Sequence, residues 1–322
     1  MKAIRIHQSG SSAVMKLEEL PTPTAGEGQL LVKLEAAGLN FIDTYQRSGL
    51  YKMELPFTPG LEGAGVVEAV GPGVNGFQVG DVVTYTGIPG AYAEYALVPA
   101  ARAIKMPKGM DIRMGAAVML QGLTAHYLCK DTYPLKAGDA CLVHAGAGGV
   151  GLLLIQMCKM IGAVVHATVS TEEKAALARE AGADHVVRYT EEDFEEVVKA
   201  RMGDGKLDVV YDSVAKTTFD KGLNLLRPRG LMVMFGQSSG PIPPFDLNTL
   251  NPKGSLYVTR PSLANYISTR QDLERRAGEV LGWVAAGKLK VRIGATFPLA
   301  EASSAHDALE GRKTTGKVLI LP

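Results

Sequence analysis

The chain has 322 residues, 46% of them hydrophobic, and its 34 basic and 33 acidic residues give a formal net charge of +1. That length exceeds the needs of one ordinary hydrophobic core and suits two domains. The balanced charge argues against a surface that binds nucleic acid or a membrane. The N-terminus, MKAIRIHQSG, lacks the apolar segment of a secretion signal, and every apolar stretch is interrupted before the ~20 residues of a membrane-spanning helix.

The cysteines indicate the cellular compartment. Cys129, Cys141 and Cys158 are an odd number at spacings of 12 and 17 residues, which is not the pattern of a disulfide framework. No pair of them has the C-x-x-C spacing of a zinc site. We therefore expect a soluble protein of a reducing compartment, the cytoplasm.

Short β-like segments separated by glycine and proline dominate the chain up to about residue 120. The expected strands are AIRIH (3–7), QLLVKLEAA (29–37), GAGVVEAVG (63–71), DVVTY (81–85) and AYAEYALV (91–98). Short strands with frequent turn signals are typical of a compact antiparallel or barrel-like β domain.

Beyond residue 120, apolar strand-like segments alternate with segments of helical length. The expected strands are ACLVHA (140–145), VVHATV (164–169), HVVRY (185–189), LDVVYDSV (207–214), GLMVMFG (230–236) and SLYVTR (255–260). This alternation predicts an α/β fold with a doubly wound parallel sheet.

The C-terminal part of the sequence returns to the style of the first domain. A longer amphipathic helix is expected over 264–287, and strand-like segments follow at VRIGATFPL (291–299) and GKVLILP (316–322). We therefore expect one domain from residues 1–120 and 289–322, with the α/β domain of residues 121–288 inserted in it.

The segment HAGAGGVG (144–151) lies between a predicted strand and a predicted helix. Its last six residues fit G-x-G-x-x-G, and a βαβ unit is the context that a dinucleotide site requires. The tight turn lets the backbone approach a pyrophosphate, and the helix N-terminus offers N–H groups to it. The alternative is a glycine-rich turn that holds no ligand.

The end of the second strand of this unit bears on which dinucleotide would bind. An NAD site places Asp or Glu about 20 residues after the glycines. Here the strand ends at Ser170, and the first acidic residue, Glu172, falls in the next helix, two residues before Lys174. A hydroxyl and a lysine suit a 2′-phosphate, so NADP(H) is favoured over NAD(H). The alternatives are that Glu172 serves the helix dipole and that Lys174 lies on a solvated helix face.

Several segments resemble the medium-chain dehydrogenase/reductase superfamily, namely GLEGAGVVEAVGPGV (60–74), VGDVV (79–83), GAYAEYALVP (90–99) and the glycine turn. Zinc alcohol dehydrogenases of that superfamily have a cysteine before the first-domain helix and a histidine in a G-H-E motif. This chain has Asn40 and Leu61 at those places, which cannot bind zinc. The four-cysteine zinc lobe is also missing, and Glu62 is expected to keep a local structural role.

Within that superfamily, the chain is most similar to the zinc-free NADPH:quinone oxidoreductase (zeta-crystallin-like) branch. Six segments carry the similarity: NFIDTYQRSGLY (40–51), QGLTAHYL (121–128), YDSV (211–214), RGLMVMFGQSSG (229–240), KGSLYVTRPSL (253–263) and GRKTTGKVLILP (311–322). The resemblance covers the entire chain. It implies a GroES-like β-barrel catalytic domain and a Rossmann domain that binds NADPH.

The resemblance also implies a set of cofactor-binding residues. In the Rossmann domain they are Tyr127, Gly148, Gly149, Val150, Ser170, Lys174, Tyr189, Ser213, Phe235, Gly236, Gln237, Ser238, Thr259 and Arg260. In the first domain they are Phe41, Ile42, Asp43, Thr44, Tyr45 and Arg312. The 2′-phosphate is expected at Ser170, Lys174, Tyr189 and Arg312, although Tyr189 as a packing residue and Arg312 as a surface charge remain alternatives.

The expected catalytic residues are Asn40, Tyr45 and Tyr51, which would form the wall of the acceptor site. Aromatic side chains suit a flat, conjugated acceptor, and tyrosine hydroxyls, or solvent, can stabilise or protonate the oxygen that is reduced. For Tyr51 the alternative is an exposed loop residue. Three histidines, His126, His144 and His166, lack ligand spacing and are expected in packing or surface roles.

These features predict NADPH-dependent reduction of quinones, by hydride or single-electron transfer and without a metal. One alternative is reduction of α,β-unsaturated carbonyl compounds. Another is an NADPH-binding structural or RNA-binding protein, against which the absence of a basic stripe argues. Residues 254–260, GSLYVTR, are expected to form an apolar edge strand that pairs with its twin in a homodimer, as it does in relatives.

Overall fold

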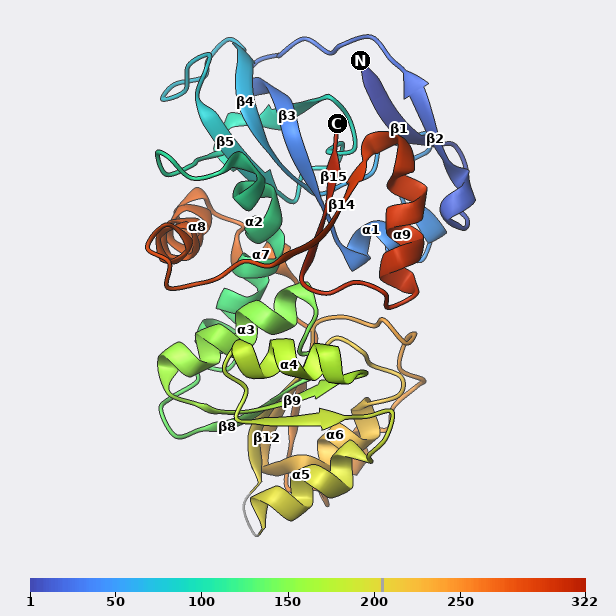
Figure 1. The fold of residues 1–322 in the computed structure, drawn as a ribbon, viewed down its shortest axis with the longest axis vertical. Helices are drawn as coiled ribbons and strands as arrows, with labels where there is room; N and C mark the ends of the chain where they lie inside the picture. The colour runs from blue at the N-terminus through green and yellow to red at the C-terminus, as the bar shows by residue number, and fades with distance from the viewer. Residues whose placement is uncertain (204–205) are drawn as a thin grey trace. The chain divides into compact units, whose positions relative to one another are not determined.

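Figure 1 shows the computed structural model, which describes residues 1–203 and 206–322 and consists of two units. Unit 1 comprises Met1–Leu123 and Tyr266–Pro322, and unit 2 comprises Thr124–Asn265. The first division of the chain falls within helix α2 (Ile112–Tyr127).

Unit 1 is built on a mostly antiparallel seven-stranded sheet. Its order is β14-β15-β3-β4-β5-β7, and β6 pairs with β3 outside this path. The strands are β3 (Gln29–Leu39), β4 (Glu62–Val70), β5 (Val82–Thr86), β6 (Tyr95–Pro99), β7 (Ile104–Lys105), β14 (Ile293–Pro298) and β15 (Lys317–Leu321). A hairpin of β1 (Lys2–Ile6) and β2 (Met15–Glu19) completes the β structure. The C-terminal β15 lies beside β3, which explains why both ends of the sequence have the same style.

Besides the part of α2 that belongs to it, unit 1 has four further α-helices among its described residues. They are α1 (Phe41–Ser48), α7 (Leu263–Tyr266, which straddles the division), α8 (Arg270–Ala285) and α9 (Ala302–Glu310). Helix α1 starts directly after β3, where Asn40 and Asp43 cap its first turn: Asn40 N–H donates to the Asp43 carboxylate, and the Asn40 carbonyl accepts from Asp43 N–H. It ends at Gly49, whose φ of 83° is the left-handed conformation that glycine adopts without strain.

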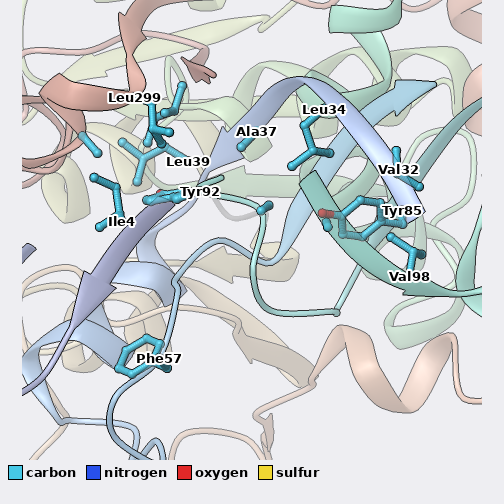
Figure 2. Packing of buried hydrophobic residues seen from close by; sticks show 14 of the residues in the cluster. Ile4, Val32, Leu34, Ala37, Leu39, Phe57, Tyr85, Tyr92, Val98 and Leu299 are labelled. Atoms are coloured by element: carbon cyan, nitrogen blue, oxygen red, sulfur yellow. The ribbon is translucent and has the colours of Figure 1, made fainter. Parts of the chain in front are cut away.

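The core of unit 1 fills the space enclosed by these strands. Figure 2 shows Val32, Leu34, Tyr85 and Val98 at one end of the cluster, and Ile4, Leu39, Tyr92 and Leu299 at the other. The side chains of β3 alternate, with exposed Lys33 and Glu35 between buried Val32, Leu34 and Ala36. Hydrophobic burial is worth roughly 1.5–3 kcal/mol for each large side chain, so this cluster is the main source of the unit's stability.

Unit 2 contains a six-stranded parallel sheet in the order β10-β9-β8-β11-β12-β13. The strands are β8 (Ala140–Val143), β9 (Val164–Val169), β10 (His185–Arg188), β11 (Leu207–Asp212), β12 (Leu226–Met234) and β13 (Tyr257–Thr259). Helices α3 (Gly149–Ile161) and α4 (Glu172–Glu180) cover one face, and α5 (Phe194–Met202) and α6 (Phe219–Leu225) cover the other (Figure 1). The sheet is therefore doubly wound, as predicted, and its strand order reverses direction between β8 and β11.

The chain returns from unit 2 to unit 1 at Tyr266, whereas the sequence predicts this boundary at residue 289. Residues 266–288, which the sequence places with the Rossmann domain, group with unit 1. The reason is a set of hydrogen bonds to the segment before β7: Arg270 Nη1 donates to the carbonyls of Ala101 and Ala103, and Arg102 donates to that of Ile267. Within the described residues, no helix combines the length and the apolar character needed to cross a membrane.

Candidate active site

The glycine turn connects β8 to α3, as the sequence predicts. A Cβ atom on Gly151 would lie 2.3 Å from the carbonyl oxygen of Ala145, and one on Gly146 would lie 2.9 Å from Cβ of Ala167 in β9. The helix therefore packs this closely on the turn and the neighbouring strand only because both residues are glycine. Among the described residues, no side chain caps the helix at Gly148. The N–H groups of the first turn of α3 thus remain suited to a phosphate.

Ser170 and Tyr189 come together at the ends of β9 and β10. The N–H of Tyr189 donates to the carbonyl of Val169 (3.0 Å), and the hydroxyl of Thr190 donates to the carbonyl of Ser170 (2.8 Å). Tyr189 is 41% exposed. Lys174 lies in the first turn of α4, where its N–H donates to Thr171 Oγ1. Ser170, Tyr189 and Lys174 therefore all belong to the segments that follow β9 and β10 at one edge of the sheet.

The first acidic residue after β9, Glu172, forms ion pairs with two arginines. Glu172 pairs with Arg179 at 2.6 Å and with Arg188 at 3.4 Å. The hydrogen bond from Arg179 is the largest cause of the lowered pKa of the Glu172 carboxyl. Glu172 also lies in the first turn of α4, where a carboxylate favours the helix dipole, as the alternative from the sequence suggested. The Glu172 carboxylate, which follows the end of β9, is thus engaged by two arginines.

The loops after β11 and β12 form the second half of the edge. Asp212 is fully buried, and its carboxylate accepts from the N–H groups of Val214 (2.6 Å) and Ala215 (3.0 Å). Ser238 N–H donates to the carbonyl of Ser213, which a Cβ on Gly236 would approach to 2.9 Å. The loop that carries Ser213 is therefore held by hydrogen bonds to the Asp212 carboxylate and by close contact with the loop that carries Gly236.

The remaining predicted residues of unit 2 take different positions. Arg260, just after β13, donates to Gln237 Oε1 (2.9 Å). This hydrogen bond joins the predicted cofactor residues after β12 to those at the end of β13. Phe235 and Thr259 are half-buried beside them. Tyr127, predicted to line the site, is only 2% exposed and belongs to the interior in this structure. The apolar surroundings at the end of α2 favour burial of its ring over presentation to a ligand.

His126, His144 and His166 are buried, in accordance with the packing role that was expected. His144 Nδ1 lies 2.8 Å from Thr168 Oγ1, and its ring contacts Phe194 edge-on. Burial lowers the pKa of His144, and burial followed by nearby positive groups lowers that of His166 to about 4. Both imidazoles are therefore neutral at pH 7. Among the described residues, no three His, Cys, Asp or Glu side chains are placed to hold a metal ion.

In unit 1, a buried ionic cluster lies where β15, β3 and β4 run side by side. Lys317 begins β15 and Glu62 begins β4, on either side of Gly38 in β3. Their side chains form an ion pair across that glycine, with 1% and 0% of the two side chains exposed. A Cβ on Gly38 would lie 2.6 Å from Cε of Lys317 and would also collide with Glu62 Oε2. Gly38 thus provides the space in which the pair meets.

Asn40 joins this cluster through every polar position of its carboxamide. Nδ2 donates to Glu62 Oε2 (2.9 Å) and to the Gly38 carbonyl (3.0 Å). Oδ1 accepts from Lys317 Nζ (3.0 Å) and from Gln121 Nε2 (3.2 Å). The predicted direct contact of Asn40 with an acceptor does not fit this arrangement, because two donors and two acceptors saturate the group. Asn40 is 4% exposed, and its side chain links Glu62, Lys317 and Gln121 through hydrogen bonds.

Asp43 and Thr44, predicted to lie against the nicotinamide, point into unit 1. The Thr44 hydroxyl donates to the Phe41 carbonyl, one turn back in α1. Asp43 is fully buried and accepts from Asn40 N–H (2.9 Å) and Tyr92 hydroxyl (3.1 Å). Burial raises the pKa of Asp43 to about 7, against the hydrogen bonds that lower it. The helix is amphipathic, and these residues occupy its inner face.

A chain of hydrogen bonds leads from Asp43 to α9. Tyr92 hydroxyl lies 3.2 Å from His306 Nε2, and Arg47 Nη1 lies 3.2 Å from His306 Nδ1. Because an arginine only donates, Nδ1 is the acceptor, and the neutral ring donates from Nε2 to Tyr92. Burial lowers the pKa of His306 to about 3, with Arg47 adding to the effect. Arg47 also forms two hydrogen bonds with Glu310 (2.8 and 3.0 Å).

Three of the predicted aromatic residues do come together. The rings of Tyr45 and Tyr51 meet edge-on with centroids 5.4 Å apart, and Phe41 lies 6.3 Å from Tyr45. Tyr51 is 37% exposed, and Phe41, Ile42 and Tyr45 are half-buried. Phe41 and Tyr45 on the outer side of α1, with Tyr51 just after the helix, thus form an aromatic face with two phenolic hydroxyls. Arg312 lies elsewhere in unit 1, exposed just after α9.

Sequence reasoning missed several residues of these clusters. Lys317, Tyr92, His306, Gln121 and Asp212 were not singled out. Lys317 carried a usable signal, since a charged residue opens the apolar segment KVLIL and such a residue is rarely buried without a partner.

The comparisons with known proteins agree with the two-domain fold. The family model of the alcohol dehydrogenase GroES-like domain matches residues 26–108, and that of the zinc-binding dehydrogenase matches residues 149–276. Fold and site thus define a dehydrogenase/reductase with a GroES-like and a Rossmann domain.

Individual relatives narrow this class. The chain is 44% identical to a quinone oxidoreductase of Pseudomonas aeruginosa, over 100% of this chain and 99% of that one. It is 42% identical to a 2-haloacrylate reductase of a Burkholderia species, over 98% of each chain. The crystal structure of Escherichia coli quinone oxidoreductase complexed with NADPH superposes with a TM-score of 0.98, at 42% identity and with 100% of both chains covered. The chain belongs to the quinone oxidoreductase (zeta-crystallin-like) family of the medium-chain dehydrogenase/reductase superfamily.

Proposed function

We propose that this protein is an NADPH:quinone oxidoreductase. The observation that carries the proposal is the edge of unit 2, where Ser170, Lys174 and Tyr189 gather beside a glycine turn. The nearby acid Glu172 is engaged by arginines. These groups fit a 2′-phosphorylated dinucleotide. The P. aeruginosa relative is named a quinone oxidoreductase, and the E. coli relative was crystallised with NADPH.

The two units divide the work. When bound, NADPH supplies the reducing equivalents. The backbone of Gly148, Gly149 and Val150 holds the pyrophosphate at the N-terminus of α3, and the loops after β11 and β12 orient the rest of the cofactor. In unit 1, the aromatic face of α1 binds the acceptor and excludes water. The hydroxyls of Tyr45 and Tyr51 stabilise negative charge on the oxygen that is reduced.

The reaction is proposed to proceed without zinc. Asn40 is saturated by hydrogen bonds, and Leu61 has no ligand atom, so neither offers the thiolate or imidazole that zinc requires. We place the protein in the cytoplasm, because its three cysteines are all free thiols.

An assay of NADPH oxidation with an ortho-quinone tests this function. Saturable turnover with NADPH, reduced by Tyr45→Phe or Tyr51→Phe, supports it. No turnover with any quinone, although NADPH binds, would contradict it. Oxygen consumption during turnover separates the two routes, since single-electron transfer yields a radical that reduces oxygen.

A second candidate acceptor is an α,β-unsaturated carbonyl compound. The 42% identity to a 2-haloacrylate reductase favours it, because that relative's named substrate carries a conjugated double bond. Parallel assays with a small enone and an ortho-quinone distinguish the two classes by kcat/KM. The structural or RNA-binding alternative predicts RNA binding at low salt, for which a net charge of +1 offers little attraction.

We also propose a homodimer through β13. This strand is at the edge of the sheet, and Tyr257 and Val258 are 60% and 37% exposed. An apolar edge strand is a template for pairing, and a second copy of the same strand satisfies it. Light scattering tests this proposal, and a monomer at micromolar concentration would contradict it.

A further inference from the structure

The ionic cluster of Lys317, Glu62 and Asn40 has no task in the function proposed above. Its two charged side chains are almost completely buried, and Glu62 also accepts from the N–H of Leu120 in α2 at 2.6 Å. A buried ion pair is a poor way to gain stability, since well-packed apolar residues of the same volume often do as well or better. A geometric role is therefore a better account of this pair than stability.

The pair dictates the orientation of one carboxamide. Lysine can only donate and an ionised carboxylate can only accept, so Asn40 must turn Oδ1 to Lys317 and Nδ2 to Glu62. A carboxamide between neutral groups has no such constraint. The same orientation presents Oδ1 to Gln121 Nε2, which fixes the second carboxamide as well.

Asn40 transmits this orientation to α1. It is the N-cap of the helix: its backbone carbonyl accepts from the N–H of Asp43 (3.0 Å), and its own N–H donates to the Asp43 carboxylate (2.9 Å). The first turn of α1 begins with Phe41 and leads to Tyr45, whose rings form the outer aromatic face. The charged pair holds the Asn40 side chain, and the backbone of Asn40 caps α1. The pair therefore helps to set where the helix starts and in which direction it runs.

We infer that Lys317 and Glu62 are positioning residues, which act through Asn40 to hold the first turn of α1 and its aromatic face in the geometry that acceptor reduction needs. This inference rests on the proposed quinone reductase function. It adds to that function two residues that touch neither the aromatic face nor the glycine turn.

The test compares the double variant Lys317→Met/Glu62→Gln with the wild type. The double variant removes both charges together, so that no uncompensated charge is left buried. We expect kcat/KM for an ortho-quinone to fall on the order of 10- to 100-fold, as small misplacements near a reacting group do. The dissociation constant for NADPH, measured by fluorescence, should change less than twofold. Amide hydrogen exchange should accelerate by about tenfold or more in residues 41–48, as the cap loosens.

Two further variants make the result specific. Glu62→Gln alone is isosteric and should show the same directions, which keeps the test available if the double variant fails to fold. Lys105→Met breaks the exposed pair with Asp81 in the same unit and should leave kcat/KM and exchange in residues 41–48 unchanged.

The inference is overturned if folded Glu62→Gln or the double variant has wild-type kcat/KM, or if its loss only follows the unfolded fraction. Unchanged exchange in residues 41–48 would overturn it as well. If the wild type binds NADPH but reduces no quinone, the proposed function fails on its own. The exchange measurement then still decides whether the pair holds α1.

Discussion

The two units build their polar sites in opposite ways. In the described part of unit 2, Asp212 is the one buried carboxylate, and the site consists of backbone N–H groups and strand ends. Unit 1 buries five charged residues, Asp43, Arg47, Glu62, Arg276 and Lys317. Unit 2 relies on features that any parallel α/β sheet offers at its carboxyl edge, whereas unit 1 relies on side chains that are costly to bury unless every partner is present.

The first prediction follows from that cost. Lys317→Met alone leaves the Glu62 carboxylate buried without its counter-ion, and we expect a loss of about 3–5 kcal/mol in the free energy of unfolding. Urea denaturation measures it. The matched change Lys105→Met, at an exposed pair, should cost less than about 1 kcal/mol. Equal effects of the two substitutions would show that burial does not distinguish the pairs.

The second prediction concerns the space between the charges. Gly38→Ala places a Cβ 2.6 Å from Lys317 Cε and 2.3 Å from the Ala116 carbonyl, so we expect it to destabilise unit 1 by about 1–3 kcal/mol. Gly278→Ala in α8 is the control, since its Cβ would meet nothing within 4 Å and alanine favours a helix by up to about 1 kcal/mol. Thermal unfolding of both variants measures the difference in stability. A Gly38→Ala protein as stable as the wild type would show that a Cβ at this position is not crowded by Lys317 and Ala116.

The third prediction is its counterpart in unit 2. A Cβ on Gly151 would lie 2.3 Å from the Ala145 carbonyl, so Gly151→Ala must displace α3 from the turn. We expect NADPH binding to weaken by about tenfold or more, because misplaced N–H groups no longer match the phosphates. Gly278→Ala in α8, far from the glycine turn in sequence and with nothing within 4 Å of the added Cβ, is the control and should leave NADPH binding unchanged. Equal affinities of the two variants would mean that this packing does not matter for binding.

The fourth prediction uses the two titrating groups linked through Tyr92. The folded state keeps His306 neutral down to a pKa of about 3, against 6.5 when unfolded, so the stability that it contributes is lost as pH falls below 6.5. Asp43, with its pKa raised from 3.8 to about 7, keeps its proton in the folded state, so its contribution is lost as pH rises from 3.8 to 7. Between pH 3.8 and 6.5, the contribution of His306 makes stability rise with pH, and the contribution of Asp43 makes it fall.

A variant that lacks one of the two groups should show the pH dependence of stability that the other group causes. Relative to wild type, the stability of Asp43→Asn should rise with pH across this window, and that of His306→Gln should fall, each by up to ~1.4 kcal/mol per pH unit. Urea denaturation at pH 4, 5 and 6 measures both. Parallel curves for the three proteins would show that neither group titrates between the folded and unfolded states as described.

The same contrast explains what the sequence revealed. The glycine turn, Ser170 and Lys174 are close together in the chain, and their geometry follows from the strands and helices that flank them, so their placement at one edge of the sheet was predictable. The cluster of unit 1 joins residues 38, 40, 62, 121 and 317, which only the strand order β15-β3-β4 brings together. No local pattern records that order, and Lys317 was therefore missed.

The errors in the predicted site have a similar origin. Asn40, Asp43 and Thr44 lie next to Phe41 and Tyr45 in sequence, but the helix turns them to its other face, where the buried network engages them. Which face of an eight-residue helix looks inward depended on partners such as Tyr92 and Lys317. Likewise, residues 266–288 joined unit 1 because of the hydrogen bonds of Arg270 and Arg102, which an amphipathic pattern does not reveal.

The central claim is that unit 2 selects a phosphorylated dinucleotide through its strand-end cluster. Titration of the protein with NADPH and with NADH, followed by nicotinamide fluorescence, tests it most directly. We expect much tighter binding of NADPH, and Lys174→Ala should weaken NADPH binding by roughly tenfold or more while changing NADH binding less than twofold. Equal affinity for the two dinucleotides, or an equal effect of the substitution on both, would contradict the account.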